Sequence, residues 1–284
     1  MRSADHMLDE IITFAQGDAR VRVALLNGSR VNPAHDPDLL SDYDVLLAVT
    51  DVESFAADES WLTRFGEVLI MQRPTNPPPQ RAWLVVFADG VRIDYTCSPT
   101  TQLAEDARAD SLTRVLLDKD AICPPLDAPS EASHLVDLPT AARFAGTCNE
   151  FWWVLLYAAK GLWRGQLLYA KGALERTVRP ELEHVLTWYA VAQAGRPLNS
   201  GASNKYLPDM LSAPLYSAYL RTFAGADSVA NWDAMEAAAA LMQEIAPQVA
   251  AAAGCSYDST EGDNARRFMR TLRTLPADAQ DLAL

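Results

Sequence analysis

Cysteine, long apolar runs and positive charge are all scarce in this chain. Its 284 residues include four cysteines, and no two of them have CxxC spacing. This scarcity argues against a disulfide framework or a zinc site and predicts a reducing, cytoplasmic environment. No apolar run approaches the roughly 20 residues that a membrane span needs, and residues 1–18 lack the basic start of a signal peptide. We therefore expect no membrane partner.

Acidic residues outnumber basic ones, and the excess is unevenly distributed. The formal net charge is −13. Residues 1–138 contain 23 acidic and 11 basic residues, whereas residues 139–284 contain 14 and 13. A protein that binds nucleic acid needs a basic surface, so we expect no nucleic-acid partner. An acidic half favours binding of a cationic small molecule; the alternative is that the acidic surface only maintains solubility.

Composition divides the chain into a mixed half and a helical half. Pro, Asp, Ala and Ser are frequent between residues 118 and 139, as in a linker. We therefore predict an α/β domain over 1–138, with a mixed sheet and flanking helices, and an all-α domain over 139–284. The functional site is expected in a cleft between them. The hydrophobic pattern predicts strands at 20–27, 43–50, 67–72, 81–88, 91–97 and 112–117 and helices at 4–17, 52–65, 99–108, 140–164, 166–179, 180–193 and 229–253.

Turn residues add four local predictions. The Asp89-Gly90 turn predicts a hairpin of the strands at 81–88 and 91–97. Residues 74–80, which include three consecutive prolines, are expected to form a loop, and so are residues 258–263. Gly254 is expected just past the end of a helix.

Two acidic residues begin the second apolar run. Asp42 and Asp44 are two positions apart, so their side chains leave the same face of a strand. Adjacent carboxylates repel each other unless a cation lies between them, and hard oxygen ligands suit Mg²⁺. We predict that Asp42 and Asp44 bind Mg²⁺ and take part in catalysis. The alternative is a solvated strand end.

A Gly-Ser turn precedes this acidic pair. Gly28, Ser29 and Arg30 follow the first apolar run. Backbone N–H groups and a hydroxyl in such a turn are suited to bind phosphate. We therefore predict that these three residues contact the phosphates of a nucleotide.

Asp94 is a third candidate acid, in the middle of a predicted strand. Aspartate is unfavourable at such a position by propensity, which suggests a specific role. Asp94 is suited to accept a proton from an attacking hydroxyl, to share a metal, or to contact the acceptor molecule. The alternative is a salt bridge to Arg92 or Arg81.

The helical half also contributes candidates. Glu150 is predicted to bind ammonium or guanidinium groups of a substrate, or to act as the base in place of Asp94; the alternative is a first-turn residue that interacts with the helix dipole. Lys205 and Tyr206, in a loop of small polar residues, are predicted to contact the nucleotide. Three further cations are weaker candidates for phosphate contacts: Lys160, Arg164 and Lys171.

The combined pattern resembles a known enzyme group. Gly28-Ser29, Asp42-x-Asp44 and Asp94 resemble the signature of nucleotidyltransferases related to DNA polymerase β. Longer segments resemble the aminoglycoside 6-adenylyltransferases, which modify streptomycin: residues 27–30, 41–44, 65–67, 117–120, 148–153, 159–164 and 205–207. The resemblance implies transfer of AMP from ATP, with Mg²⁺, to a hydroxyl of an aminoglycoside and release of pyrophosphate. Streptomycin, modified at position 6, is the expected acceptor, and a monomer is the expected state.

Two other functions remain open at this point. One is nucleotidyl transfer to a different small molecule or to a protein. The other is a non-catalytic protein that binds a nucleotide or an aminoglycoside. Three acids in one site argue against the second alternative, because a binding protein has no need of them.

Overall fold

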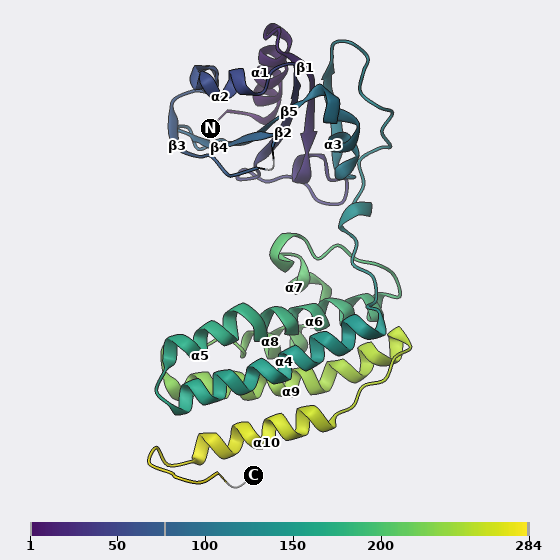
Figure 1. Cartoon of the computed structure of the whole chain (residues 1–284). Coiled ribbons are helices and arrows are strands. Elements are labelled where there is room, and N and C mark those ends of the chain that lie inside the picture. The colour runs from purple at the N-terminus through teal and green to yellow at the C-terminus, as the bar shows by residue number, and fades with distance from the viewer. Residues whose placement is uncertain (1, 77, 283–284) are drawn as a thin grey trace. The chain divides into compact units, whose positions relative to one another are not determined.

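The computed structural model describes residues 2–76 and 78–282, and backbone contacts divide the chain into two units, Met1–Ser133 and His134–Leu284. The first unit is a mixed sheet with helices on its faces, and the second is helical, which confirms the predicted fold class (Figure 1). A loop was expected over residues 74–80; its described residues form no helix or strand, and Pro77 lies outside the described part.

The first unit contains a six-stranded sheet with the order β3-β4-β5-β2-β1-β6. Its strands are β1 (Val21–Asn27), β2 (Tyr43–Val49), β3 (Val68–Gln72), β4 (Arg81–Phe87), β5 (Arg92–Pro99) and β6 (Thr113–Asp118). Neighbours β2 and β5 run parallel, and all other neighbours run antiparallel. The predicted hairpin is confirmed, because β4 and β5 pair across the turn at Gly90.

Helices cover both faces of this sheet. Helix α1 (Ala4–Gly17) and helix α2 (Glu53–Ala57) pack on one face, and helix α3 (Leu103–Ala109) packs on the other (Figure 1). Successive side chains of β2 point to opposite faces of the sheet: Leu47 packs in the core under α1, whereas Leu46 and Ala48 pack in the core under α3.

One predicted helix of the first unit is wrong. The sequence suggested a single helix over 52–65, but α2 ends at Ala57 and a 3-10 segment, Glu59–Phe65, follows. Asp58 separates them with an extended backbone (φ −137°), and its carboxylate accepts a hydrogen bond from the N–H of Ser60 at 2.9 Å. An aspartate that caps a new turn competes with continuation of the helix.

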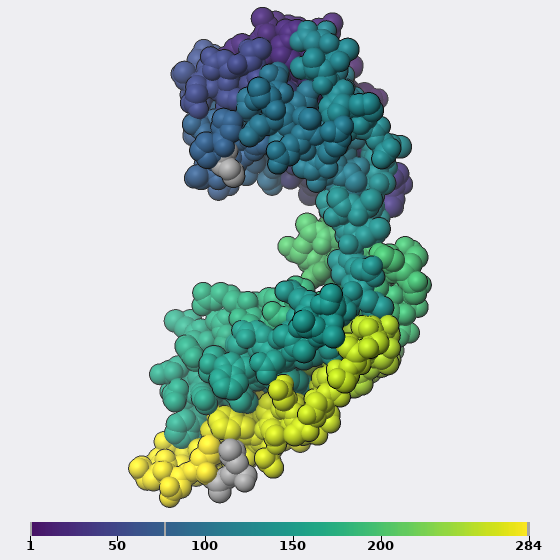
Figure 2. Space-filling view, turned by 45° about the vertical axis from the view of Figure 1, so that its right-hand side comes forward, coloured from purple at the N-terminus to yellow at the C-terminus, as the bar shows by residue number. Residues whose placement is uncertain are grey.

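The second unit packs its helices around one apolar core. The helices are α4 (Ala141–Trp163), α5 (Leu167–Ala173), α6 (Arg179–Ala194), α7 (Leu207–Met210), α8 (Ala213–Leu220), α9 (Ser228–Ala253) and α10 (Thr260–Thr274), with a π turn (Leu174–Val178) between α5 and α6. Phe151, Leu186 and Met242, from α4, α6 and α9, are fully buried together. Helix α10 lies along α4 at the surface (Figure 2).

Sequence patterns missed parts of this unit. Helices α7, α8 and α10 were not predicted, and residues 258–263, where α10 begins at Thr260, were expected to form a loop. Gly254 ends α9 in a left-handed conformation (φ +66°), as its position suggested. All four cysteines are free. Among the described residues, no helix combines the length and the apolar character that crossing a membrane requires.

Candidate functional site

The two central strands bring the three predicted acids together. Asp44 on β2 lies directly opposite Asp94 on the parallel neighbour β5. Asp42 comes two residues before Asp44, so it projects from the same face. This is the face on which α3 packs, since Leu46, the next residue on that face of β2, contacts the α3 core. Residues 42, 44 and 94 therefore form one acidic group on the sheet.

The Gly28 turn packs directly against this acidic group. Gly28 follows β1, which pairs with β2, and its φ of +73° is a left-handed conformation that favours glycine. A Cβ atom at position 28 would lie only 2.4 Å from Oδ2 of Asp44. Glycine is therefore needed here for two reasons: the backbone angle and the close approach of a carboxylate.

Arg92 pairs with two of the three acids. Its Nε donates to Oδ1 of Asp94 at 2.9 Å, its Nη2 donates to Oδ2 at 2.7 Å, and its Nη1 lies 3.2 Å from Oδ2 of Asp42. The salt bridge between Asp94 and Arg92, which the sequence left open as an alternative, is therefore present. Arg81 pairs with Glu53 instead.

Burial and mutual repulsion disfavour the charged forms of the acids. Burial, and then the charges of Asp94 and Asp42, raise the pKa of Asp44 to about 6. The pKa of Asp42 is raised mainly by burial, which the Arg92 guanidinium opposes and Asp94 reinforces. Concentrated negative charge of this kind is stabilised when a cation is added.

The donor set fits a divalent metal such as Mg²⁺. This ion is usually held by one or two carboxylates together with substrate phosphates, and Asp42 and Asp44 supply two carboxylates on one face. Although Asp42, Asp44 and Asp94 share one face, no three His, Cys, Asp or Glu side chains in the described part of the chain are placed so that they could hold a metal ion as they stand, and Arg92 is paired with two of the acids. The acids therefore have the right chemistry, and one protein cation already lies among them.

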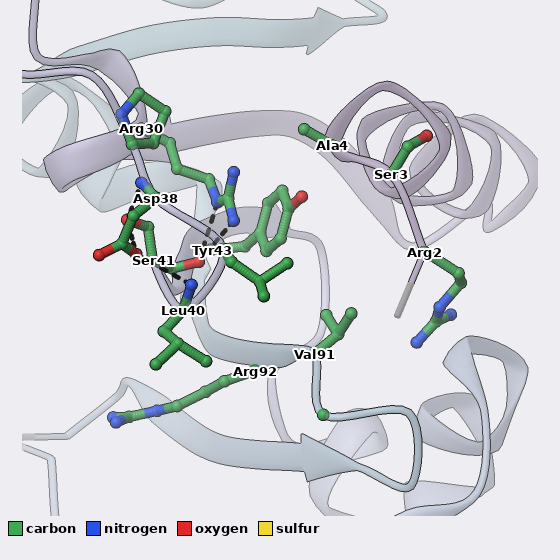
Figure 3. Close-up of a pocket in the computed structure, with 13 residues that line it drawn as sticks. Arg2, Ser3, Ala4, Arg30, Asp38, Leu40, Ser41, Tyr43, Val91 and Arg92 are labelled. Atoms are coloured by element: carbon green, nitrogen blue, oxygen red, sulfur yellow. Dashed lines mark hydrogen bonds between the residues drawn. The ribbon is translucent and has the colours of Figure 1, made fainter.

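Ser29 and Arg30 occupy different environments beside this group. The Ser29 hydroxyl makes no hydrogen bond to another described residue. The Arg30 guanidinium donates from Nε to the carbonyl oxygens of Ser41 and Asp42, each at 3.1 Å, and stacks 3.7 Å above the ring of Tyr43. Figure 3 shows this stack at the edge of a cavity of about 340 Å³. Arg30 thus holds the segment that carries Asp42, and its predicted phosphate contact stays a prediction.

A second cavity opens directly over the acids. It has a volume of about 450 Å³ and is lined by Asp44, Asp94, Asp110 and Asn27, among others. Asn27 lies opposite Asp44 on β1, and its Oδ1 is buried without a hydrogen-bond partner among the described residues. Sequence reasoning assigned no role to Asn27 or Asp110. Asn27 could have been found from its place before Gly28, whereas Asp110 carries no local signal.

Comparison with known proteins places this site in a family. Residues 1–272 match the family described as streptomycin adenylyltransferase. The chain belongs to this family. Aminoglycoside 6-adenylyltransferase of Bacillus subtilis is 35% identical over 272 residues, which cover 92% of this chain and 95% of that protein. The Campylobacter jejuni protein of the same name is 34% identical, with coverage of 88% and 89%.

A solved structure supports the same assignment. The crystal structure of an aminoglycoside 6-adenyltransferase from Bacillus subtilis has a TM-score of 0.50 and 26% sequence identity to this chain. The match covers 97% of this chain and 100% of that one. The streptomycin adenylyltransferase family thus accounts for both units of the fold.

The remaining predicted site residues of this family member belong to the helical unit. Glu150 is exposed on α4, nine residues after the helix begins at Ala141, so its alternative as a first-turn residue is wrong. Lys205 is exposed, with its Nζ 4.9 Å from the ring centre of Tyr206. Lys171 is committed to Glu175 and to a backbone carbonyl, which makes it a structural cation.

Side-chain hydrogen bonds hold the loop that precedes Lys205. Asn204 adopts a left-handed backbone (φ +58°), and its Nδ2 donates to Oε2 of Glu183 on α6 at 2.9 Å. Ser200 donates from Oγ to Oδ1 of Asn204 at 2.9 Å, and Tyr219 donates its hydroxyl to Oε1 of Glu183 at 2.5 Å. Asparagine tolerates this backbone region better than most residues. Glu183 of α6 thus fixes the loop next to the predicted nucleotide contact, and Tyr219 of α8 holds Glu183 in place.

Proposed function

We propose that the protein transfers the adenylyl group of ATP to a hydroxyl of an aminoglycoside, with streptomycin, modified at position 6, as the preferred acceptor. The observation that carries the proposal is the pairing of Asp44 with Asp94 on the central strands, beside Gly28. Family membership gives this acidic group its chemical context, because relatives with this fold are named aminoglycoside 6-adenylyltransferases.

The proposed reaction makes one bond and breaks one. The acceptor hydroxyl oxygen bonds to the α-phosphorus, the bond from that phosphorus to the bridging oxygen breaks, and pyrophosphate leaves with the electron pair. Asp42 and Asp44 would hold Mg²⁺, which neutralises phosphate charge when bound. The backbone and hydroxyl of Gly28-Ser29 would hold the phosphates. Lys205 and Tyr206 are the proposed further contacts of the nucleotide. Positioning and charge neutralisation supply most of the acceleration in such a reaction.

Asp94 is the proposed acceptor of the hydroxyl proton. It lies in the same cavity as Asp44 and reaches the space where the acceptor would bind. Both of its carboxylate oxygens accept hydrogen bonds from Arg92, so one of them must be released before it takes a proton. Glu150 is the alternative base, and its variant separates the two assignments.

A cationic acceptor suits the cavity over the acids. Asp44, Asp94 and Asp110 line it, and the surrounding residues 1–138 contain an excess of acidic residues. Ammonium and guanidinium groups of an aminoglycoside would be attracted to such a wall at short and long range. A neutral or anionic acceptor would gain nothing from this charge.

The test is an adenylylation assay with a panel of acceptors. Purified protein is incubated with ATP, Mg²⁺ and streptomycin, other aminoglycosides or a neutral sugar, and both pyrophosphate release and the mass of the acceptor are measured. We expect streptomycin to gain one adenylyl group, and the Asp42→Asn variant to lose this activity. Turnover with a different acceptor class would overturn the acceptor assignment, and no turnover with any acceptor would indicate a binding protein.

A further inference from the structure

The sequence placed Arg92 among the alternatives for Asp94, but the structure gives it a place among the acids. It lies two residues before Asp94 on β5, on the same face. Every side-chain hydrogen bond that it makes to a described residue goes to Asp94, and its ion pairs join Asp94 and Asp42. The arginine therefore bridges the proposed base and one of the proposed metal ligands.

These contacts use the oxygens that a metal would need. A carboxylate that accepts a charge-assisted hydrogen bond from a guanidinium is less available to a second cation, and two neighbouring cations repel each other. Asp44, by contrast, has no ion pair of its own within 4.0 Å among the described residues. Arg92 is one positive charge shared among three negative ones, so the group retains a net negative charge that attracts a divalent ion.

The two arginines that border Asp42 differ in how firmly they are held. Arg30 donates to two backbone carbonyls and stacks on Tyr43, so no ligand exchange at the carboxylates would release it. Arg92 is held through side-chain carboxylates, and 41% of its side chain is exposed. Arg92 also lines the cavity of about 340 Å³, and its head group points away from the other labelled residues of that cavity (Figure 3).

We propose that Arg92 is an internal counter-ion that a divalent metal displaces from Asp42 and Asp94, and that the released guanidinium then binds the phosphates of the nucleotide. The first half concerns the metal site alone. The second half rests on the proposed function, because it requires a nucleotide next to the metal. Release of Arg92 also frees an oxygen of Asp94, so Asp94 would become available as a base only when the metal has bound.

The first experiment measures binding of Mn²⁺ to the nucleotide-free, full-length protein. Mn²⁺ takes the same oxygen ligands as Mg²⁺ and is detected directly by its paramagnetic signal. We expect Arg92→Gln to tighten Mn²⁺ binding at least about threefold at low ionic strength, because a competing cation is gone. Arg92→Lys keeps the charge without the planar fork, so its affinity should fall between the two.

Two control variants accompany this measurement, one expected to leave Mn²⁺ binding unchanged and one expected to abolish it. Arg81→Gln removes an arginine of matched exposure, 40%, whose partner Glu53 lies outside the acidic group, and it should bind Mn²⁺ as the wild type does. The double variant Asp42→Asn with Asp44→Asn should bind no Mn²⁺ at this site. Misfolding of Arg92→Gln would weaken metal binding, the opposite of the expected change. Unchanged or weaker binding by Arg92→Gln would overturn the displacement.

The second experiment measures ATP binding with saturating Mg²⁺. If the released guanidinium contacts phosphate, Arg92→Gln should bind ATP several-fold more weakly than the wild type although it binds the metal more tightly. Unchanged ATP affinity would overturn the second half of the proposal. Neither titration requires an acceptor or turnover. A protein that behaves as expected here but adenylylates no aminoglycoside would refute the proposed function and leave the role of Arg92 standing.

Discussion

Replacing Gly28 with alanine tests the close approach between the Gly-Ser turn and the acids. The new Cβ would lie 2.4 Å from Oδ2 and 3.3 Å from Cγ of Asp44, so the carboxylate must move aside. The φ of +73° adds a backbone cost of about 1 kcal/mol, since alanine disfavours left-handed conformations. The substitution thus has two separable effects, one on stability and one on the position of a proposed metal ligand.

The two effects differ in size. A loss of about 1 kcal/mol lowers the melting temperature of a unit of this size by about 2–5 °C. A displacement of about 1 Å in a catalytic ligand can reduce turnover by about 100-fold. We therefore expect Gly28→Ala to be folded and only slightly less stable, but to lose most of its kcat.

Gly195→Ala provides the matched control. Gly195 has a similar φ of +64°, but a Cβ there would meet nothing within 4 Å. Thermal melts by circular dichroism and kcat by pyrophosphate release are measured for both variants. We expect similar small losses of melting temperature and a loss of kcat in Gly28→Ala alone. Wild-type activity in Gly28→Ala, or an equal loss of kcat in Gly195→Ala, would refute the reasoning.

Three further predictions concern charge. Burial and neighbouring acids raise the pKa of Asp44 to about 6, so the folded protein binds a proton at this carboxylate more tightly than the unfolded chain does. The metal-free wild type should therefore lose stability relative to Asp44→Asn as the pH rises from about 4 to about 6. Paired thermal melts test this, and a pH-independent difference would contradict it. Asp94→Asn should lower kcat far more than it changes the KM for ATP, whereas Glu150→Gln should keep most of its kcat; steady-state kinetics showing the reverse would make Glu150 the base. The KM for the aminoglycoside should rise with ionic strength, because salt screens exposed charges beyond about 8 Å, and a flat salt titration would show that the acidic half does not attract the acceptor.

Local signals were sufficient to predict the parts of the site that depend on short stretches of chain. The spacing of Asp42 and Asp44 predicted a shared face, and the turn at Gly90 predicted the hairpin that carries Asp94. Each of these signals depends on side-chain alternation or on turn chemistry, which act within a few residues. The sequence therefore predicted which strands carry Asp44 and Asp94, and the structure confirms those strands, while the roles of the acids stay predictions.

Other features depend on contacts that no local pattern encodes. The parallel pairing of β2 with β5 joins segments about 50 residues apart and decides which acids face each other. The two-residue spacing places Arg92 on the same face of β5 as Asp94, but the contact of Arg92 with Asp42 depends on the pairing of β5 with β2. Helix α10 was not predicted, because the buried residues of its first half, Gly262 and Ala265, are small and the polar residues around them suggested a loop.

The position of the acids in the middle of the sheet has a consequence for how such an enzyme diversifies. Strands β5 and β2 have two further strands on either side, so the separation of Asp44 and Asp94 is set by backbone pairing and resists local adjustment. Pro74 and Asn76, which line the larger cavity from a loop, are under no such restraint. Selection for a new acceptor would thus first alter loop residues, and the reaction would be inherited unchanged while the range of acceptors shifts.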